Sequence, residues 1–154
     1  NEGKIIGIMS EAGCPGVADP GQLLIKIAQE LDVKINPLVG PSSILLALMA
    51  SGMNGQSFSF HGYLPIDEGQ RMKALKELET VSAKTRFTQI FIETPYRNNQ
   101  MIQTILKTCS SRTRLCIAVD ITGSSESIKT KTIAQWKNLS IDIHKKPAIF
   151  LLNG

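Results

Sequence analysis

The first third of the chain alternates extended apolar segments with helical ones, and this order restricts the possible folds more than any other feature. Residues 3–9 form an apolar strand-like run, and residues 33–39 form a shorter alternating one. A segment with the helical spacing of apolar residues follows each, over 21–31 and over 42–51. This repeated order of strand, loop and helix predicts parallel βαβ units in a sheet covered by helices.

After about residue 55 the pattern changes to a longer and more varied series of elements. We expect an extended segment over 57–64, a helix over 70–83, a strand over 88–93, a helix over 96–109, strands over 114–121 and 127–132, a short helical turn over 133–137 and a closing strand over 148–152. The residues expected to face inward from the first of these helices are Met72, Leu75, Leu78 and Val81. The sequence therefore predicts an α/β protein with a parallel βαβ remnant over 1–55 and a mixed-sheet domain over 56–154.

Composition excludes several classes of protein. The longest apolar run, Ile44–Ala50, has seven residues, far short of the roughly 18 that a membrane-spanning helix needs. Three cysteines without a CxxC pair indicate neither a disulfide framework nor a zinc ribbon, and favour a reducing, cytoplasmic setting. His61 and His144 have no partners at metal-ligand spacing, so we expect no metal site. A net charge of +4 permits an anionic partner such as RNA without identifying it.

The first residue is Asn1 rather than Met, and residues 3–9 already form the apolar strand-like run, with no signal or transit pattern before it. A buried parallel strand needs neighbours on both sides. We therefore expect the chain to be a piece of a longer polypeptide whose amino-terminal part is absent.

The loop over 10–21 is the most informative stretch for function. It carries three glycines and two prolines between a predicted strand and a predicted helix, where α/β sheets place their ligands. Glycines let backbone amides approach a ligand closely, and prolines fix the shape of a loop before binding. The loop lacks the Gly-Lys-Ser/Thr of a nucleotide-binding P-loop. The alternative is a rigid connection in which Asp19 caps the following helix.

A second loop, over 37–43, repeats this design and ends in Ser42 and Ser43. Both loops would project from one edge of the sheet and form a cleft, although Ser after Gly-Pro is also an ordinary helix start. The helix that follows is apolar nearly all round from Ile44 to Met49, which fits burial between layers or at a twofold interface.

Five motifs follow one another along the chain. They are Ser10-Glu11-Ala12-Gly13-Cys14-Pro15-Gly16-Val17-Ala18-Asp19-Pro20-Gly21, Gly40-Pro41-Ser42-Ser43, Ser51-Gly52, Phe60-His61-Gly62-Tyr63-Leu64-Pro65 and Glu93-Thr94-Pro95-Tyr96-Arg97. In order and spacing they resemble the tetrapyrrole methylase family, with the small-subunit ribosomal RNA cytidine 2′-O-methyltransferases as the most similar branch. The resemblance covers nearly the whole chain.

The resemblance implies a homodimeric, S-adenosylmethionine-dependent methyltransferase with its cofactor between two α/β domains. The positions that match the family's cofactor contacts are Gly13, Cys14, Pro15, Val17, Ser42, Ser43, Glu93 and Ile121. The first loop would hold the cofactor largely through backbone groups. The family's other glycine-rich loop has no counterpart in the sequence, which agrees with an absent amino-terminal part.

One departure from the branch concerns its chemistry. Relatives carry an Arg-Glu-Leu-Thr-Lys-like run after the fourth strand, whereas this chain has Val119-Asp120-Ile121-Thr122-Gly123-Ser124-Ser125-Glu126. Glu93 and Asp120 are the candidate catalytic carboxylates, although Glu93 is equally suited to an ion pair with Arg97. If the substrate is RNA, its candidate phosphate contacts are Arg97, Lys129, Lys131, Lys145 and Lys146.

The function expected from these features is methyl transfer to ribosomal RNA, at the ribose 2′-oxygen of a cytidine, by positioning the acceptor in line with the methyl group. Two alternatives stay open. One is a methylase of a tetrapyrrole or another small molecule, and the other is an inactive module that binds the cofactor or mediates dimerisation.

Overall fold

The computed structural model describes residues 3–154 and divides the chain into two compact units. The first unit ends at Ser43, and the second runs from Ile44 to Gly154. The predicted domain boundary near residue 55 lies farther along the chain than this division. No helix in the described part of the chain is long and apolar enough to cross a membrane.

The first unit contains one regular element among its described residues, helix α1 (Gln22–Glu30). Gly21 is its N-cap residue, with φ of 127°, and no side chain accepts a capping hydrogen bond there. The alternative in which Asp19 caps this helix is therefore not formed, because Asp19 lies two residues before the cap position.

The strands predicted over 3–9 and 33–39 are not formed, and this part of the prediction is wrong. Neither segment makes the ladder hydrogen bonds of a strand within the described residues. Apolar side chains of both are open to solvent, with Ile5 98% and Leu38 87% exposed. The hydrophobic alternation is present, but an extended segment becomes a strand only when a neighbouring strand pairs with its backbone.

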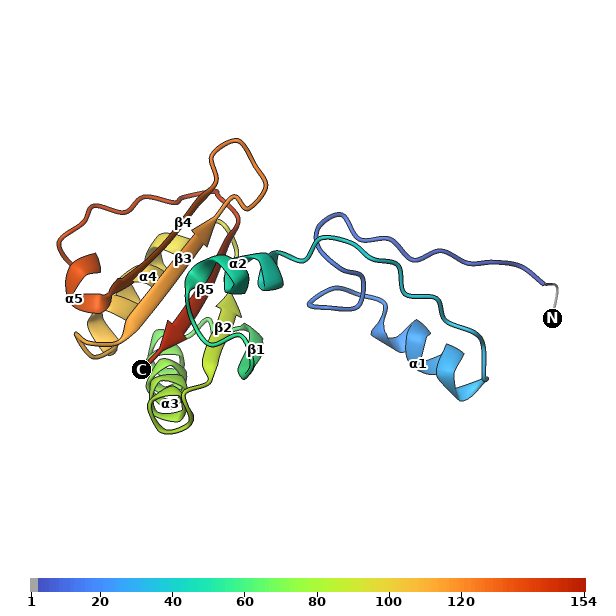
Figure 1. Cartoon of the computed structure of the whole chain (residues 1–154), viewed down its shortest axis with the longest axis horizontal. Helices are drawn as coiled ribbons and strands as arrows, with labels where there is room; N and C mark the ends of the chain where they lie inside the picture. The colour runs from blue at the N-terminus through green and yellow to red at the C-terminus, as the bar shows by residue number, and fades with distance from the viewer. Residues whose placement is uncertain (1–2) are drawn as a thin grey trace. The chain divides into compact units, whose positions relative to one another are not determined.

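The second unit is built on a five-stranded mixed sheet (Figure 1). Its strands are β1 (Phe58–Tyr63), β2 (Thr88–Ile92), β3 (Arg114–Val119), β4 (Ser127–Thr132) and β5 (Ala148–Asn153), in the order β1-β2-β5-β3-β4. Its helices are α2 (Ser43–Ser51), which begins at the boundary, α3 (Glu68–Thr85), α4 (Asn98–Thr108) and α5 (Ile133–Trp136). These elements confirm the α/β class and the mixed sheet predicted for this part of the chain.

Three strands of the sheet run in the same direction. β1 is parallel to β2, and β5 is antiparallel to both β2 and β3, so β2 and β3 also point the same way. Ile92 and Ala118 both pair with Ile149, which puts the ends of β2 and β3 at nearly the same level. The carboxyl ends of β1, β2 and β3 consequently share one edge of the sheet, the place where α/β folds hold their ligands.

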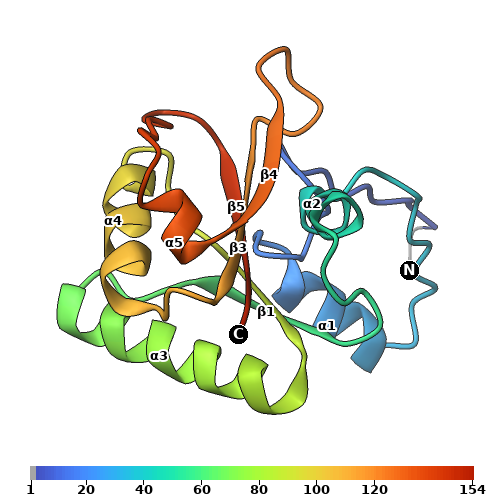
Figure 2. The same cartoon turned by 60° about the vertical axis from the view of Figure 1, so that its left-hand side comes forward.

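The two faces of the sheet carry separate hydrophobic clusters, and Figure 2 shows the helices of the second unit on either side of the sheet. On one face α3, α4 and α5 cover alternate strand residues such as Phe91, Ile117 and Phe150. On the other face α2 covers the intervening residues, including Ile90 and Leu151. This alternation follows from the two-residue period of a strand and needs apolar side chains on both faces.

Helix α2 has one buried side, although its sequence is apolar nearly all round. Ala47 and Leu48 pack against the sheet, while Leu45 and Met49 on the other side are exposed. The sequence predicts burial of α2 between layers or at a twofold interface, but within the second unit only one side of this helix is buried.

In helix α3 the buried residues differ in part from those that the apolar pattern of the sequence predicts. Leu75 and Leu78 are buried as predicted, whereas Val81 is 45% exposed and its predicted inward position is wrong. Arg71 and Glu79 are buried instead. Both polar side chains satisfy backbone groups of neighbouring loops, and such partners make their burial tolerable.

Glu79 joins α3 to the turn between α4 and β3. Its Oε1 accepts hydrogen bonds from the backbone N–H of Ser110 at 2.6 Å and from the Thr113 hydroxyl, and its Oε2 accepts from Lys76 Nζ at 3.1 Å. Burial raises the pKa of Glu79, but these hydrogen bonds outweigh it and hold the pKa below the usual glutamate range.

We predict that Glu79→Ala lowers the free energy of unfolding at neutral pH by about 1–3 kcal/mol, because buried donors lose their acceptor. The stabilisation from Glu79 is present above its unfolded-state pKa and is lost as the pH falls through its lower folded-state pKa. Urea unfolding as a function of pH measures both effects. Glu77→Ala, on the exposed side of the same helix, is the control. Equal stability of the two variants would contradict the prediction.

Candidate functional site

The loop over 10–21 is shaped by local turn chemistry. The Val17 N–H donates to the Cys14 carbonyl at 3.2 Å, which closes a four-residue turn with Pro15 and Gly16 at its centre. Gly16 has φ of 77°, and proline followed by a left-handed glycine is the signature of a type II turn. The Cys-Pro-Gly-Val sequence therefore specifies this turn by itself.

The two predicted cofactor loops meet within the first unit. Cys14 Sγ donates a weak hydrogen bond to the Pro41 carbonyl at 3.7 Å. This contact places the Gly13–Val17 part of the first loop beside the Gly40–Ser43 loop. The two motifs therefore lie side by side in the first unit, although the strands expected to precede them are not formed.

The first loop leaves its glycine backbone open to approach. No atom lies within 4 Å of a Cβ built on Gly13 or on Gly16, and both residues have positive φ angles. Val17 is exposed, Cys14 and Ser42 are partly exposed, and Ser43 is exposed. Backbone groups with this much free space around them fit a ligand that is held mainly by the main chain.

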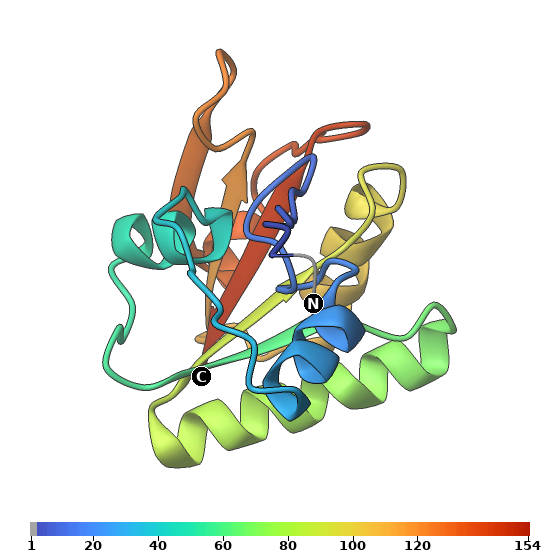
Figure 3. The same cartoon turned by 90° about the vertical axis from the view of Figure 1, so that its right-hand side faces the viewer.

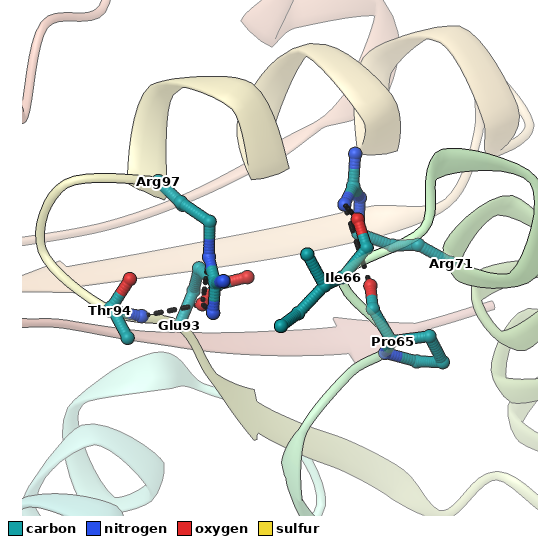
Figure 4. Close-up of polar contacts among 6 residues, drawn as sticks. All are labelled: Pro65, Ile66, Arg71, Glu93, Thr94 and Arg97. Carbon is teal, nitrogen blue, oxygen red and sulfur yellow. Dashed lines mark hydrogen bonds and ion pairs between the residues drawn. The ribbon is translucent and has the colours of Figure 1, made fainter.

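Glu93 occupies the carboxyl end of β2, at the shared edge of the sheet. Its side chain is 1% exposed and forms an ion pair with Arg97, with 2.6 Å between Glu93 Oε1 and Arg97 Nη2. The same oxygen accepts from Arg97 Nε at 3.0 Å and from the Thr94 N–H at 2.7 Å (Figure 4). The backbone N–H of Arg97 also donates to the Thr94 carbonyl at 2.9 Å. The motif is therefore a turn that the Glu93 carboxylate stabilises.

Arg71 is a buried residue of this edge that sequence reasoning missed. It is 2% exposed, and its Nη1 donates to the carbonyls of Ile66 at 2.7 Å and Pro65 at 3.4 Å (Figure 4). Its Nε and Nη2 donate to the Thr104 hydroxyl of α4. Arg71 thereby fastens the loop after β1 to two helices, and no carboxylate pairs with it among the described residues.

Asp120 follows β3 at the same edge, where the loop to β4 extends beyond the sheet (Figure 3). Its Oδ2 accepts from the Ser125 N–H at 2.9 Å and from the Ser125 hydroxyl at 2.6 Å. These hydrogen bonds hold the pKa of Asp120 below its usual range. Asp120 and Thr122 have φ of 50° and 67°, and this left-handed conformation is uncommon for a β-branched residue such as Thr122. A Cβ on Gly123 would meet the Asp120 carboxylate, so a larger residue here would displace the Asp120 side chain.

Ile121 and the two predicted lysine contacts lie on different parts of the second unit. Ile121 packs at the margin of the cluster under α2. Lys129 and Lys131 pair with Ile117 and Leu115 across β4 and β3, so they share the face covered by α4 and α5. Both line a groove of about 500 Å³ together with Lys146, Ser125, Ser127 and Asp142.

The predicted site residues thus form two groups. Gly13, Cys14, Pro15, Val17, Ser42 and Ser43 belong to the loops of the first unit, and Glu93, Arg97, Asp120, Ile121, Lys129 and Lys131 belong to the second. Within the second unit, Glu93 and Asp120 share one sheet edge through the common direction of β2 and β3. Residues 3–154 contain no cluster of His, Cys, Asp and Glu arranged to hold a metal ion.

Sequence comparisons identify relatives for most of the chain. A Vibrio cholerae protein named ribosomal RNA small subunit methyltransferase I is 35% identical over 133 residues, which are 86% of this chain and 45% of that protein. A protein of the same name from Buchnera aphidicola subsp. Schizaphis graminum is 35% identical over 154 residues, 98% of this chain and 53% of that protein. The chain spans about half the length of the curated relatives it matches. No protein-family model matches the chain.

Two solved structures with a similar fold are methyltransferases. The methyltransferase CobJ superimposes with a TM-score of 0.59 at 16% identity, covering 92% of this chain and 62% of CobJ. The cobalt precorrin-4 methyltransferase CbiF, a cobalamin biosynthetic enzyme, gives 0.53 at 15% identity, covering 92% of this chain and 61% of CbiF.

Fold and motifs together define the class of the chain as tetrapyrrole-methylase-like, and the comparisons confirm the resemblance seen in the sequence. Its sequence is similar to those of proteins named ribosomal RNA small subunit methyltransferase I, and its fold is similar to those of the methyltransferases CobJ and CbiF.

We predict that the Glu93–Arg97 pair is energetically coupled. Arg97→Gln leaves a buried carboxylate without its cation, which lowers the free energy of unfolding on the order of 3 kcal/mol. The double variant Glu93→Gln with Arg97→Gln recovers much of this loss, because the uncompensated charge is gone. Denaturant unfolding of both single variants and the double variant gives the coupling energy.

The matched control is Lys107→Gln, which removes a cation from a solvent-exposed ion pair with Glu68. We expect it to change stability by no more than about 0.5 kcal/mol. If the loss of stability in the double variant equals the sum of the losses in the two single variants within about 0.5 kcal/mol, Glu93 and Arg97 are not coupled.

Proposed function

We propose that the chain is part of an S-adenosylmethionine-dependent methyltransferase that methylates small-subunit ribosomal RNA, at the ribose 2′-oxygen of a cytidine. The observation that carries this proposal is the match to relatives named ribosomal RNA small subunit methyltransferase I, which extends over 85–99% of this chain. The match to the Buchnera aphidicola subsp. Schizaphis graminum protein covers 98% of the chain, so it includes the loops over 10–21 and 37–43 and the Glu93–Arg97 turn. A homodimer in the cytoplasm is the proposed form and setting of the whole protein.

The cofactor contacts proposed for the first unit are Gly13, Cys14, Pro15, Val17, Ser42 and Ser43. Their fit to S-adenosylmethionine is supported by the open backbone around Gly13 and by the Cys14–Pro41 contact that joins the two loops. Glu93 and Ile121 are the contacts proposed for the second unit. When bound, S-adenosylmethionine supplies an electrophilic methyl group, and its transfer to a 2′-hydroxyl yields S-adenosylhomocysteine and a ribose methyl ether with loss of the hydroxyl proton.

Glu93 and Asp120 have different proposed roles in that reaction. Glu93 Oε1 already accepts from Arg97 and Thr94, so we assign Glu93 mainly to holding Arg97 at the sheet edge. The Asp120 carboxylate is solvent-accessible, but its hydrogen bonds to Ser125 lower its basicity. We therefore propose that Asp120 orients the acceptor and that positioning supplies most of the rate acceleration.

The proposed RNA contacts are Arg97, Lys129 and Lys131. The groove supports this assignment for the two lysines, since they line it together with Lys146. Lysine side chains along a groove suit the phosphates of a nucleic-acid backbone, and such contacts weaken as the salt concentration rises.

A small-molecule acceptor is the second candidate. The fold similarity to CobJ and CbiF favours it, as does the Asp120–Glu126 loop, which lacks the charged run of the ribosomal RNA branch. An inactive cofactor-binding or dimerisation module is the third reading, and it predicts cofactor binding without transfer to any acceptor.

We predict that deletion of the gene removes a 2′-O-methylcytidine from small-subunit ribosomal RNA, measured by nucleoside mass spectrometry. Complementation with the full-length gene product restores the modified nucleoside. An unchanged profile, combined with S-adenosylhomocysteine binding by the purified protein, would favour the small-molecule reading over the RNA one.

We predict that Gly13→Val weakens S-adenosylhomocysteine binding by the full-length gene product about tenfold or more. Gly13 has φ of 74°, where a β-branched residue is strained, so the loop changes shape at the proposed contact. Isothermal titration calorimetry measures the affinity. Gly55→Ala is the control, since Gly55 lies outside the loops with open space around it and no positive φ. Unchanged affinity in Gly13→Val would contradict the cofactor assignment of this loop.

A further inference from the structure

Two segments far apart in the sequence are fastened together beside the Glu93–Arg97 turn. Lys145 donates its N–H to the Pro95 carbonyl at 3.1 Å. The Asn98 side-chain amide donates to the Lys146 carbonyl at 2.6 Å. These bonds hold the turn over 142–146 against the first turn of α4, next to the shared edge of the sheet.

The same turn is tied to α4 at a second point. Asn99 Nδ2 donates to Asp142 Oδ1 at 2.9 Å, and the Ile143 N–H donates to Asn99 Oδ1 at 3.0 Å. The hydrogen bond from Asn99 leads the interactions that hold the pKa of Asp142 below its usual range. The only carboxylate of this turn is thus engaged with α4, whereas the lysines that follow it are exposed.

The fastened segments expose an aromatic pair next to these two cations. Tyr96 is 70% exposed, and its ring meets the ring of His144 edge to face, with centroids 6.0 Å apart. Lys145 and Lys146 continue directly from His144. We call Tyr96, His144, Lys145 and Lys146 the Tyr96 platform.

An exposed aromatic ring and adjacent cations are the two elements with which proteins hold an unpaired nucleotide. A base stacks on the ring through its π-face, and lysines contact the flanking phosphates. Lys146 also lines the groove that contains Lys129 and Lys131, so the row of cations continues from the platform into the groove. A base within a duplex is already stacked on its neighbours and does not offer a free face.

We propose that the Tyr96 platform binds an unpaired nucleotide of the RNA substrate, with its base stacked on Tyr96 and its phosphates near Lys145 and Lys146. This inference rests on the proposed function and adds the structural form of the RNA, a single-stranded segment. The RNA backbone then enters the groove at Lys146.

The first test compares RNA binding by Tyr96 variants of the full-length gene product. Fluorescence anisotropy is measured with a labelled, unstructured RNA oligonucleotide and with the blunt duplex of the same sequence. We expect Tyr96→Leu to weaken binding of the single strand about tenfold, while Tyr96→Phe stays within about twofold because it keeps the ring. Binding of the duplex changes little in either variant.

Phe87→Leu is the matched aromatic control, because Phe87 is a partly exposed ring just before β2, at the opposite end of that strand. We expect it to bind the single strand like the unmodified protein. Thermal melting confirms that each variant is folded. Equal single-strand affinity in Tyr96→Leu and Phe87→Leu would overturn the platform.

The second test concerns the cations. The double variant Lys145→Gln with Lys146→Gln is expected to reduce the slope of log affinity against log salt by about 0.7 for each phosphate that the protein no longer neutralises. Lys84→Gln, an exposed lysine in the last turn of α3, leaves the slope unchanged. An unchanged slope in the double variant would overturn the phosphate contacts at the platform.

The two proposals fail in different ways. If gene deletion removes the ribosomal RNA methylation but platform variants bind single strands normally, the platform is overturned and the proposed function stands. If deletion leaves the RNA profile unchanged and the purified protein binds no RNA, the proposed function falls and the platform falls with it.

Discussion

The insertion of β5 between β2 and β3 is the constraint on which the rest of the second unit depends. Because β5 is antiparallel to both neighbours, it makes β2 and β3 point the same way, and the residues after each strand arrive at one edge. Phe150, Leu151 and Leu152 of β5 are completely buried and contribute to the clusters on both faces. Without this strand, the Glu93 turn and the Asp120 loop would have no common frame.

Much of the second unit is predictable because its elements carry strong local signals. The helices and strands after residue 57 fall where hydrophobic period and turn residues place them, within a few residues at their ends. The segments over 3–9 and 33–39 differ because a strand also requires a pairing partner, which a single-sequence pattern does not supply. Val81 is exposed and Arg71 is buried for a related reason. The helical period of the sequence identifies apolar positions, but it does not reveal the loop carbonyls that accept hydrogen bonds from a buried guanidinium.

The candidate site combines predictable turns with contacts that no motif announces. Cys-Pro-Gly-Val and Thr-Pro-Tyr-Arg each place proline second in a turn, and both turns form in the structure. The Glu93–Arg97 pair follows from their spacing in the sequence. By contrast, the contacts of Cys14 with Pro41 and of Tyr96 with His144 arise from distant segments, and only the tertiary fold brings them together.

The buried guanidinium of Arg71 holds the loop after β1 through the fixed shape of a single group. A guanidinium is planar and carries its N–H donors in a rigid fork, so the directions of its hydrogen bonds are set together. Its Nη1 donates to the carbonyls of Pro65 and Ile66, while its Nε and Nη2 donate to the Thr104 hydroxyl. A displacement of α4 at Thr104 would therefore be passed to the loop after β1 through this one side chain.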